Sequence, residues 1–138
     1  MRALVQRVRR ASVAVDGREV AAIGPGLLVL LGVVRDDAEA QADRLAERVG
    51  ALRVFEGPDG RLSEPLGDRE ALCVSQFTLY ANTRKGNRPS FTDAAPAELA
   101  EPLYVRFCDR LGARRGVFGA RMAVELVNDG PVTLMLEA

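Results

Sequence analysis

The sequence predicts an α+β domain in which a compact, mainly antiparallel and barrel-like β-sheet packs against two main helices. Short apolar segments bounded by turn residues open and close the chain, and two longer segments have the apolar spacing of amphipathic helices. Their order is strands, helix, strands, helix, strands, which favours helices on one face of an antiparallel sheet. The length of 138 residues fits a single domain spanning residues 1–138.

The N-terminal part of the chain predicts four strands. Leu4–Val8 begins the first, and the dipeptide Asp16-Gly17 joins Ala11–Val15 to Arg18–Ile23 as a hairpin. A continuous apolar run then extends from Leu27 to Val34. A run of this kind fits a strand that is buried on both faces.

The first helix is expected to start at Asp36. This residue can cap the helix, and Glu39 stands three positions later, as in a capping box. An apolar stripe with helical spacing follows, formed by Leu45, Val49 and Leu52. A short strand at Arg53–Glu56, the turn Gly57–Gly60 and a longer strand at Ala71–Leu79 come next.

The second half of the chain predicts a loop, a helix and two strands. Asn82–Ala95 lacks periodicity and indicates a long loop, which in compact domains is often a functional segment. The second helix has one apolar face, formed by Leu99, Leu103, Phe107 and Leu111. Pro102 marks either its first position or a kink. The last strands are expected at Met122–Val127 and Val132–Leu136, with a break at Asn128–Pro131.

The composition excludes several common hydrolase sites. The chain has no histidine, so neither a Ser-His-Asp nor a Cys-His arrangement can form. Cys73 and Cys108 lie within apolar patterns, and we expect buried free thiols without a disulfide or a zinc site. A Ser-Lys pair would have to use Lys85. The Asp and Glu residues show no metal-binding spacing, and no glycine-rich nucleotide loop follows a strand.

The charge pattern limits the possible partners. Lys plus Arg and Asp plus Glu number 19 each, and the resulting zero net charge argues against broad nucleic-acid binding, including DNA. Arg84, Lys85 and Arg88 nevertheless gather in the long loop, with Phe91 nearby. They predict either a clamp for RNA phosphates or an ordinary solvated loop. The chain shows no membrane-length apolar run and no signal-peptide pattern, so we expect a cytoplasmic protein with no membrane partner.

Two short segments concentrate the remaining candidate residues. The first lies at the end of a predicted strand and contains Ser75, Gln76, Phe77 and Thr78. As a strand it would place Gln76, Thr78 and Tyr80 on one face, which indicates either a lined site or a solvated strand face. The second is Gly130-Pro131, which is either an ordinary turn or, with a cis bond, a rarer feature.

These segments resemble the signature motifs of the D-aminoacyl-tRNA deacylase family. The first motif is Ser75-Gln76-Phe77-Thr78-Leu79-Tyr80-Ala81, and the second is Asn128-Asp129-Gly130-Pro131-Val132-Thr133. The resemblance covers nearly the whole chain, with similar segments at Arg2–Val8, Gly26–Val33, Thr83–Phe91 and Gly116–Ala120. Each segment alone is weak evidence, whereas all of them in this order and spacing are specific.

The resemblance implies a homodimer that hydrolyses the ester between a D-amino acid and the 3′-terminal adenosine of tRNA. It implies action on glycine mischarged on tRNA(Ala) and rejection of L-aminoacyl-tRNA. The pocket would be lined by Ser75, Gln76, Phe77 and Thr78. A cis Gly130-Pro131 pair would select chirality in the pocket of the partner subunit, and Arg7 would help to hold that turn.

The resemblance also implies a mechanism that needs neither histidine nor a cofactor. The ribose 2′-hydroxyl of the substrate would assist, and backbone N–H groups near Phe77 and Thr78 would stabilise the oxyanion. Thr78 has no base to activate it, so we assign it a positioning role. Backbone carbonyls that exclude an L side chain cannot exclude glycine, and a Cβ at Gly130 would fill the slot that they form.

Two alternatives stay open from the sequence. One is a sibling editor that clears an L-amino acid, such as alanine, from the wrong tRNA, and it would need a trans Gly130-Pro131 bond. The other is a non-catalytic RNA-binding module, which the basic residues Arg84, Lys85 and Arg88 support. That module would bind tRNA without cleaving the ester.

Overall fold

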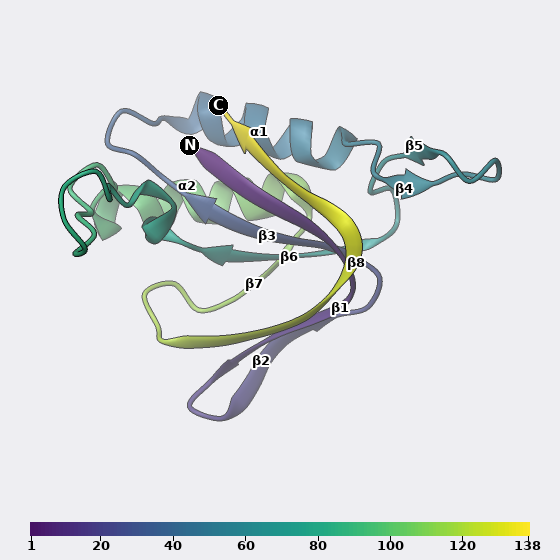
Figure 1. The fold of residues 1–138 in the computed structure, drawn as a ribbon, viewed down its shortest axis with the longest axis horizontal. Helices are drawn as coiled ribbons and strands as arrows, with labels where there is room; N and C mark the ends of the chain where they lie inside the picture. Colours follow the sequence, from purple (N-terminus) through teal and green to yellow (C-terminus); the bar gives the residue numbers. More distant parts are fainter.

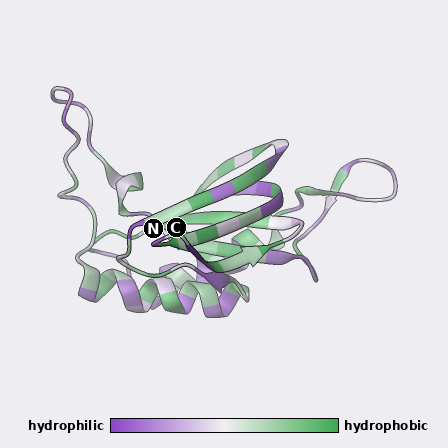
Figure 2. Ribbon diagram, turned by 90° about the horizontal axis from the view of Figure 1, so that it is seen from below, coloured by the Kyte–Doolittle hydropathy of each residue, from purple (hydrophilic) through white to green (hydrophobic).

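A computed structural model describes all residues 1–138, and a mixed six-stranded sheet forms its centre. The strand order is β2-β1-β3-β6-β7, and β8 pairs with β1. The elements are β1 (Arg2–Val15), β2 (Arg18–Ile23), β3 (Gly26–Gly32), α1 (Glu39–Ala51), β4 (Phe55–Glu56), β5 (Leu62–Glu64), β6 (Glu70–Ser75), the 3₁₀ turn η1 (Phe77–Tyr80), α2 (Ala97–Leu111), β7 (Arg114–Arg115) and β8 (Met122–Glu137). Both helices lie on one side of the sheet (Figures 1 and 2).

Strand β1 pairs with three other strands of the sheet. Its first half pairs antiparallel with β3 and its second half with β2, while β8 runs antiparallel to it from Arg2 to Val15. β3 pairs parallel with β6, and β6 with β7. β8 bends sharply along its length, so that the sheet curls into a partly closed barrel (Figure 1). The predicted α+β fold with a barrel-like sheet and two helices is confirmed, and the sheet is mixed because β6 and β7 add parallel pairs.

Strand β3 is buried on both faces of the sheet. Leu27, Val29 and Leu31 of β3 belong to the larger apolar cluster, which also contains the buried residues of both helices. Leu28 belongs to a second cluster on the other face, together with Val74 of β6. The predicted burial of both faces of this strand is therefore confirmed. Figure 2 shows hydrophilic residues on the helix faces that point away from the sheet.

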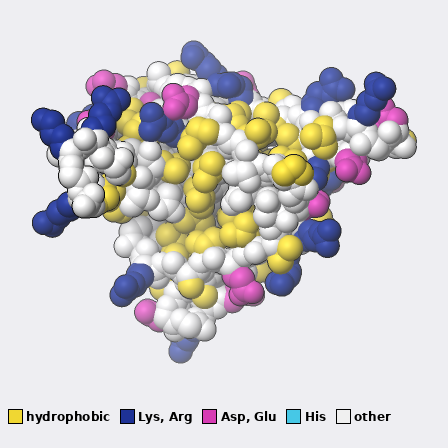
Figure 3. All heavy atoms as spheres, viewed as in Figure 1, with side chains coloured by type: hydrophobic (Ala, Val, Ile, Leu, Met, Phe, Trp, Pro, Cys, Tyr) yellow, Lys and Arg dark blue, Asp and Glu magenta, His cyan; other side chains and the backbone are white.

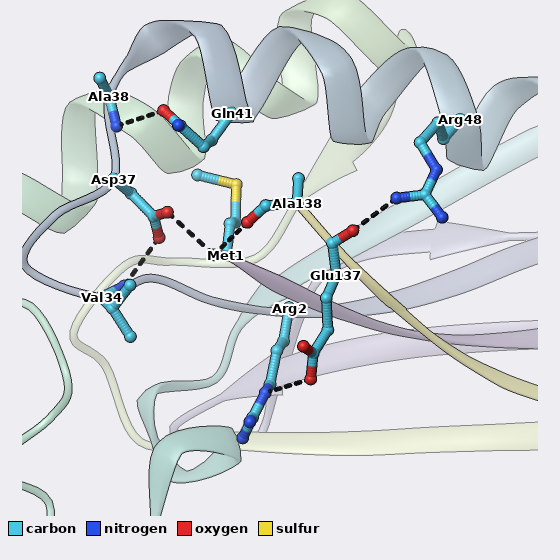
Figure 4. A network of polar contacts seen from close by, with 9 residues as sticks. All are labelled: Met1, Arg2, Val34, Asp37, Ala38, Gln41, Arg48, Glu137 and Ala138. Carbon is cyan, nitrogen blue, oxygen red and sulfur yellow. Dashed lines mark hydrogen bonds and ion pairs between the residues drawn. The ribbon is translucent and has the colours of Figure 1, made fainter.

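The first helix begins later than the sequence predicted. Ala38 is the N-cap, and its backbone N–H donates to the side chain of Gln41 at 2.9 Å. The predicted start at Asp36 is wrong, because Asp36 and Asp37 belong to a turn in which the Asp37 carboxylate binds groups outside the helix. Asp37 is buried and accepts hydrogen bonds from the α-amino group of Met1 at 2.9 Å and the amide of Val34 at 2.8 Å (Figure 4).

Polar contacts also fasten the ends of β1 and β8 to α1 (Figure 4). The α-amino group of Met1 donates to the carbonyl of Ala138 at 3.0 Å, and Arg48 of α1 donates to the carbonyl of Glu137. Arg2 pairs with the Glu137 carboxylate at 2.7 Å. These contacts fix the first residues of β1, and with them the position of the Arg2 side chain.

Helix α2 begins at Ala97, with Pro102 in its interior, so the first-position alternative for this proline is wrong. Without an N–H, Pro102 cannot continue the helical hydrogen-bond ladder at that point. Cys73 and Cys108 are buried free thiols, as predicted, and burial raises the pKa of Cys73 well above its usual range. No helix has the length and apolar character needed to span a membrane.

Candidate functional site

The first motif forms a tight turn and not a strand end. β6 stops at Ser75, the amide of Gln76 donates to the carbonyl of Leu31 at 2.7 Å, and η1 follows. The predicted strand to Leu79 and the common face of Gln76, Thr78 and Tyr80 are therefore wrong. β3 ends at Gly32, so the chain has no partner strand beyond Ser75. A Cβ on Gly32 would lie 3.1 Å from the side chains of η1, and this glycine therefore permits their close approach.

A cavity of about 320 Å³ opens beside this turn. Its walls come from β3, the end of β6, η1, the start of α2 with the segment before it, the turn before β8 and β8 itself. The lining comprises Leu31, Val33, Ser75, Phe77, Ala95, Ala97, Ala100, Phe118, Gly119, Ala120 and Met122. None of these side chains titrates, so any proton transfer in the cavity must use groups from outside its walls.

The turn presents the Phe77 ring to the cavity, whereas Gln76 and Thr78 do not line it. Phe77 is 55% exposed, and its ring packs edge-to-face against Phe91 with centroids 5.2 Å apart. The side-chain amide of Gln76 donates to the hydroxyl of Thr78. Thr78 is exposed, and its hydroxyl has no acid or base as a partner. The N–H groups of Phe77 and Thr78 start the 3₁₀ turn, so they have no acceptor within it.

The second motif lies inside a continuous β8, at irregularities in its pairing with β1. The predicted break at Asn128–Pro131 is thus a local distortion of one strand. The Gly130-Pro131 peptide bond is cis. The side-chain amide of Asn128 spans the turn by donating to the carbonyls of Arg7 at 2.9 Å and Val132 at 3.2 Å.

Arg7 holds this turn from the neighbouring strand. Its side chain is buried, donates to the carbonyl of Val54 at 2.7 Å and that of Asp129 at 3.0 Å, and lies 3.3 Å from the Asp129 carboxylate. Gly130 and Pro131 remain exposed. They line a second pocket of about 400 Å³, which includes Arg7 and shares no residue with the cavity beside η1.

The structure therefore separates the two groups of predicted site residues within one chain. Ser75, Gln76, Phe77 and Thr78 lie together at the turn after β6. Arg7, Gly130 and Pro131 lie together where β8 bends, toward the opposite end of the molecule (Figure 1).

The predicted basic loop projects near η1. A bridge between Asn82 and Ser90 closes its base through two backbone hydrogen bonds of 2.7 and 2.9 Å. Arg84, Lys85 and Arg88 are exposed, and none of them has an ion-pair partner within the chain. Figure 3 shows Lys and Arg side chains projecting into solvent at this end of the molecule.

Most of the residues that line the cavity were not predicted as site residues from the sequence. Ala97, Ala100 and Gly119 have small side chains that leave the space open. The signal available was a glycine with a left-handed backbone, since Gly119 has a φ of 75°. No three His, Cys, Asp or Glu side chains lie close enough together to hold a metal ion.

Comparison with known proteins identifies relatives along the whole chain. A family model described as D-Tyr-tRNA(Tyr) deacylase matches residues 4–137. All of this chain aligns at 57% identity with 92% of the D-aminoacyl-tRNA deacylase of Roseiflexus castenholzii (strain DSM 13941 / HLO8). It aligns at 54% identity with 97% of the D-aminoacyl-tRNA deacylase of Opitutus terrae (strain DSM 11246 / JCM 15787 / PB90-1).

Solved structures show the same fold. One, described as c-Myc DNA Unwinding Element Binding Protein, has a TM-score of 0.93 at 43% identity over 100% of this chain and 99% of that chain. Another, described as a probable eukaryotic D-amino acid tRNA deacylase, has a TM-score of 0.79 at 20% identity over 99% and 98%, which is evidence of fold alone. Because the family model spans nearly all of its residues, this chain belongs to the D-Tyr-tRNA(Tyr) deacylase family.

Proposed function

We propose that this protein hydrolyses the ester of D-aminoacyl-tRNA, releases the free D-amino acid and tRNA, and rejects L-aminoacyl-tRNA. The observation that supports this most directly is the cavity beside η1. Its apolar walls suit an amino-acid side chain or an adenine ring. Ser75 and Phe77 line it, and the N–H groups of Phe77 and Thr78 stand at the start of the turn.

The chemistry we propose relies on the substrate and on the backbone. The ester carbonyl lies against the N–H groups of Phe77 and Thr78, which stabilise the negative charge that develops on its oxygen. The 2′-hydroxyl of the terminal ribose assists the attack. The hydrogen bond between Gln76 and Thr78 holds the Thr78 hydroxyl in one position, where it orients the substrate. This scheme matches a cavity whose lining has no titratable side chain.

We further propose a homodimer in which each site is completed by the partner's Gly130-Pro131 turn. Within one chain the two motifs line separate pockets that share no residue. Apolar side chains gather on the face along which β8 runs (Figure 3). Leu134 and Met135 of β8 are exposed, and Val124 and Leu126 of the same strand are only half-buried. An exposed apolar surface of this kind is typical of a protein interface.

Chiral selection then follows from the rigidity of the turn. Arg7 and Asn128 fix its backbone through the hydrogen bonds described above, so its carbonyls keep their positions when a substrate enters. A carbonyl wall set against the L side-chain position excludes any L residue but accepts a hydrogen atom there. Glycine mischarged on tRNA(Ala) is therefore a substrate as well.

The tRNA body is proposed to lie along the basic loop. Arg84, Lys85 and Arg88 are unpaired and exposed beside η1, and Arg is well suited to bind phosphate. An enzyme with this substrate works where tRNA is charged and used, so we assign the protein to the cytoplasm.

Single-turnover reactions with D-tyrosyl-tRNA test the proposed activity. We expect ester cleavage at the same rate with and without EDTA. Binding of the tRNA without cleavage would contradict the proposal and favour the RNA-binding module.

Complementation tests the shared site. Gly130→Val damages the turn, and Ala97→Trp fills the cavity from an exposed position at the start of α2. Each variant alone is expected to be inactive. Because half of randomly mixed dimers contain both variants and each of these has one intact site, mixing should restore about a quarter of wild-type activity. Mixtures that stay inactive, although both variants are folded and exchange subunits, would contradict the shared site.

A further inference from the structure

A polar pocket of about 280 Å³ lies next to the cavity of the proposed active site. The larger side chains that line this polar pocket belong to Arg2, Tyr80, Asn82, Arg84 and Asp93. Nothing in the proposed ester chemistry uses it. Its combination of cationic, anionic and amide side chains differs sharply from the apolar lining of the neighbouring cavity.

Two chain segments contribute to both spaces. In η1, Phe77 lines the cavity and Tyr80 lines the polar pocket, three residues later. In the segment before α2, Ala95 lines the cavity and Asp93 the polar pocket. A 3₁₀ turn rises about 2 Å per residue, so Phe77 and Tyr80 are offset by roughly 6 Å along η1. This is about one step between successive nucleotides of an unstacked single strand.

The walls of the polar pocket are held in place by contacts within the chain. The Arg2 guanidinium stacks over the Tyr80 ring, 4.5 Å from its centroid, and donates to the carbonyl of Leu79 at 3.1 Å. The carbonyl oxygen of the Asn82 side chain accepts a hydrogen bond from the backbone of Arg84 at 3.0 Å. The amide nitrogen of the same side chain is left free to donate.

The two charged groups that face the space have no partner of their own. Neither the Arg84 guanidinium nor the Asp93 carboxylate forms an ion pair within the chain, and both residues are exposed. A simple anion would be repelled by Asp93, and a simple cation by Arg84. A ligand with both an anionic group and a hydrogen-bond donor satisfies both residues.

We propose that the polar pocket binds the penultimate nucleotide of the substrate, the cytidine that precedes the terminal adenosine of every tRNA. Asp93 accepts a hydrogen bond from the N4 amino group of cytosine, the pairing that Asp and Glu make with this base. Arg84 binds the phosphate that links the cytidine to its neighbour. Asn82 donates to the pyrimidine edge. This subsite rests on the proposed function, because it requires the adenosine in the cavity.

The subsite gives the enzyme a means to recognise a tRNA end and not just an aminoacyl ester. Single-stranded RNA ends are recognised in this way, through the Watson–Crick edges of splayed bases. Uracil carries an acceptor oxygen where cytosine carries the N4 amino group, so Asp93 would repel it. An Asn at position 93 would offer an acceptor to cytosine and a donor to uracil.

The test uses D-tyrosyl esters of three short probes: adenosine alone, the trinucleotide CCA and the trinucleotide CUA. We expect wild-type kcat/KM to be about tenfold higher for CCA than for CUA. In Asp93→Asn the ratio should fall to about twofold or less, as expected for an amide that accepts either base. Hydrolysis of the adenosine ester should be unchanged in Asp93→Asn, which also reports that this variant is folded.

Asp68→Asn is the matched control, because Asp68 is another exposed carboxylate without an ion pair and does not line the polar pocket. It should keep the wild-type preference for CCA. Equal cleavage of CCA and CUA by the wild type, or an Asp93→Asn protein with the wild-type ratio, would overturn the subsite while leaving the proposed function intact. Failure of the wild type to cleave any of the three D-esters would overturn both.

Discussion

Replacing Arg7 with methionine tests how the Gly130-Pro131 turn is held. Methionine keeps an unbranched apolar stem but removes the guanidinium. The carbonyl of Val54 then loses a buried charge-assisted bond of 2.7 Å, and that of Asp129 loses a part-buried bond of 3.0 Å. A buried acceptor left without a partner costs about 1–3 kcal/mol, and a part-buried one costs less because water can reach it.

The expected loss for Arg7→Met is therefore about 3 kcal/mol in the free energy of unfolding, or a Tm lower by roughly 10 °C for a chain of this size. Arg9→Met is the control, since the Arg9 side chain is 76% exposed and lies 3.9 Å from the Asp129 carboxylate. An exposed ion pair of this kind contributes about 0–1 kcal/mol. Denaturant unfolding followed by circular dichroism measures both variants.

The same two variants separate stability from selection. Below its lowered Tm, folded Arg7→Met should lose discrimination between D- and L-tyrosyl-tRNA, because the turn carbonyls are no longer fixed. Arg9→Met should discriminate like the wild type. Equal stabilities for the two variants, or an Arg7→Met protein with unaltered discrimination, would refute the assigned role of Arg7.

Three further predictions concern packing, protonation and chemistry. Gly26→Ala should destabilise the fold by about 3 kcal/mol or more in thermal unfolding, because its Cβ would overlap the carbonyl of Glu70, whereas Gly24→Ala, with its nearest neighbour 3.5 Å away, should cost far less. Burial raises the pKa of Tyr80 to about 12, above the value of about 10 expected in the unfolded chain. The protonated Tyr80 side chain therefore contributes its full stabilisation below pH ~10, and this stabilisation is lost as the pH rises to ~12. Urea titrations across this range should show the decline in the wild type and a smaller decline in Tyr80→Phe. Thr78→Val should raise KM by about threefold to tenfold with little change in kcat, and a loss of kcat of about a thousandfold would instead make Thr78 a nucleophile.

Local patterns in the sequence predicted most of the fold. The apolar run Leu27–Val34 correctly predicted a strand buried on both faces. The turn dipeptide Asp16-Gly17 correctly predicted the β1–β2 hairpin. The errors arose where a distant partner decides the local structure. β1 is continuous because β8 pairs with both of its halves, and α1 starts after Asp37 because the α-amino group of Met1 binds that carboxylate.

The same reason explains what the sequence could not predict about the site. The strand expected through Leu79 ends at Ser75, because β3 ends at Gly32 and leaves the next residues without a partner. The cavity walls contributed by Ala97 and Gly119 come from segments with no chemical groups to attract attention. The resemblance to a family identified the motif residues, but the fold was needed to show that Gly130-Pro131 does not line the cavity of its own chain.

The proposed activity distinguishes two stereoisomers of an otherwise identical ester. The most direct test measures single-turnover deacylation of D-tyrosyl-tRNA and L-tyrosyl-tRNA by the same preparation, with the spontaneous hydrolysis of each ester subtracted. We expect rapid loss of the D-ester and no enzymatic loss of the L-ester. Loss of both esters at similar rates, or of neither, would contradict the proposed activity.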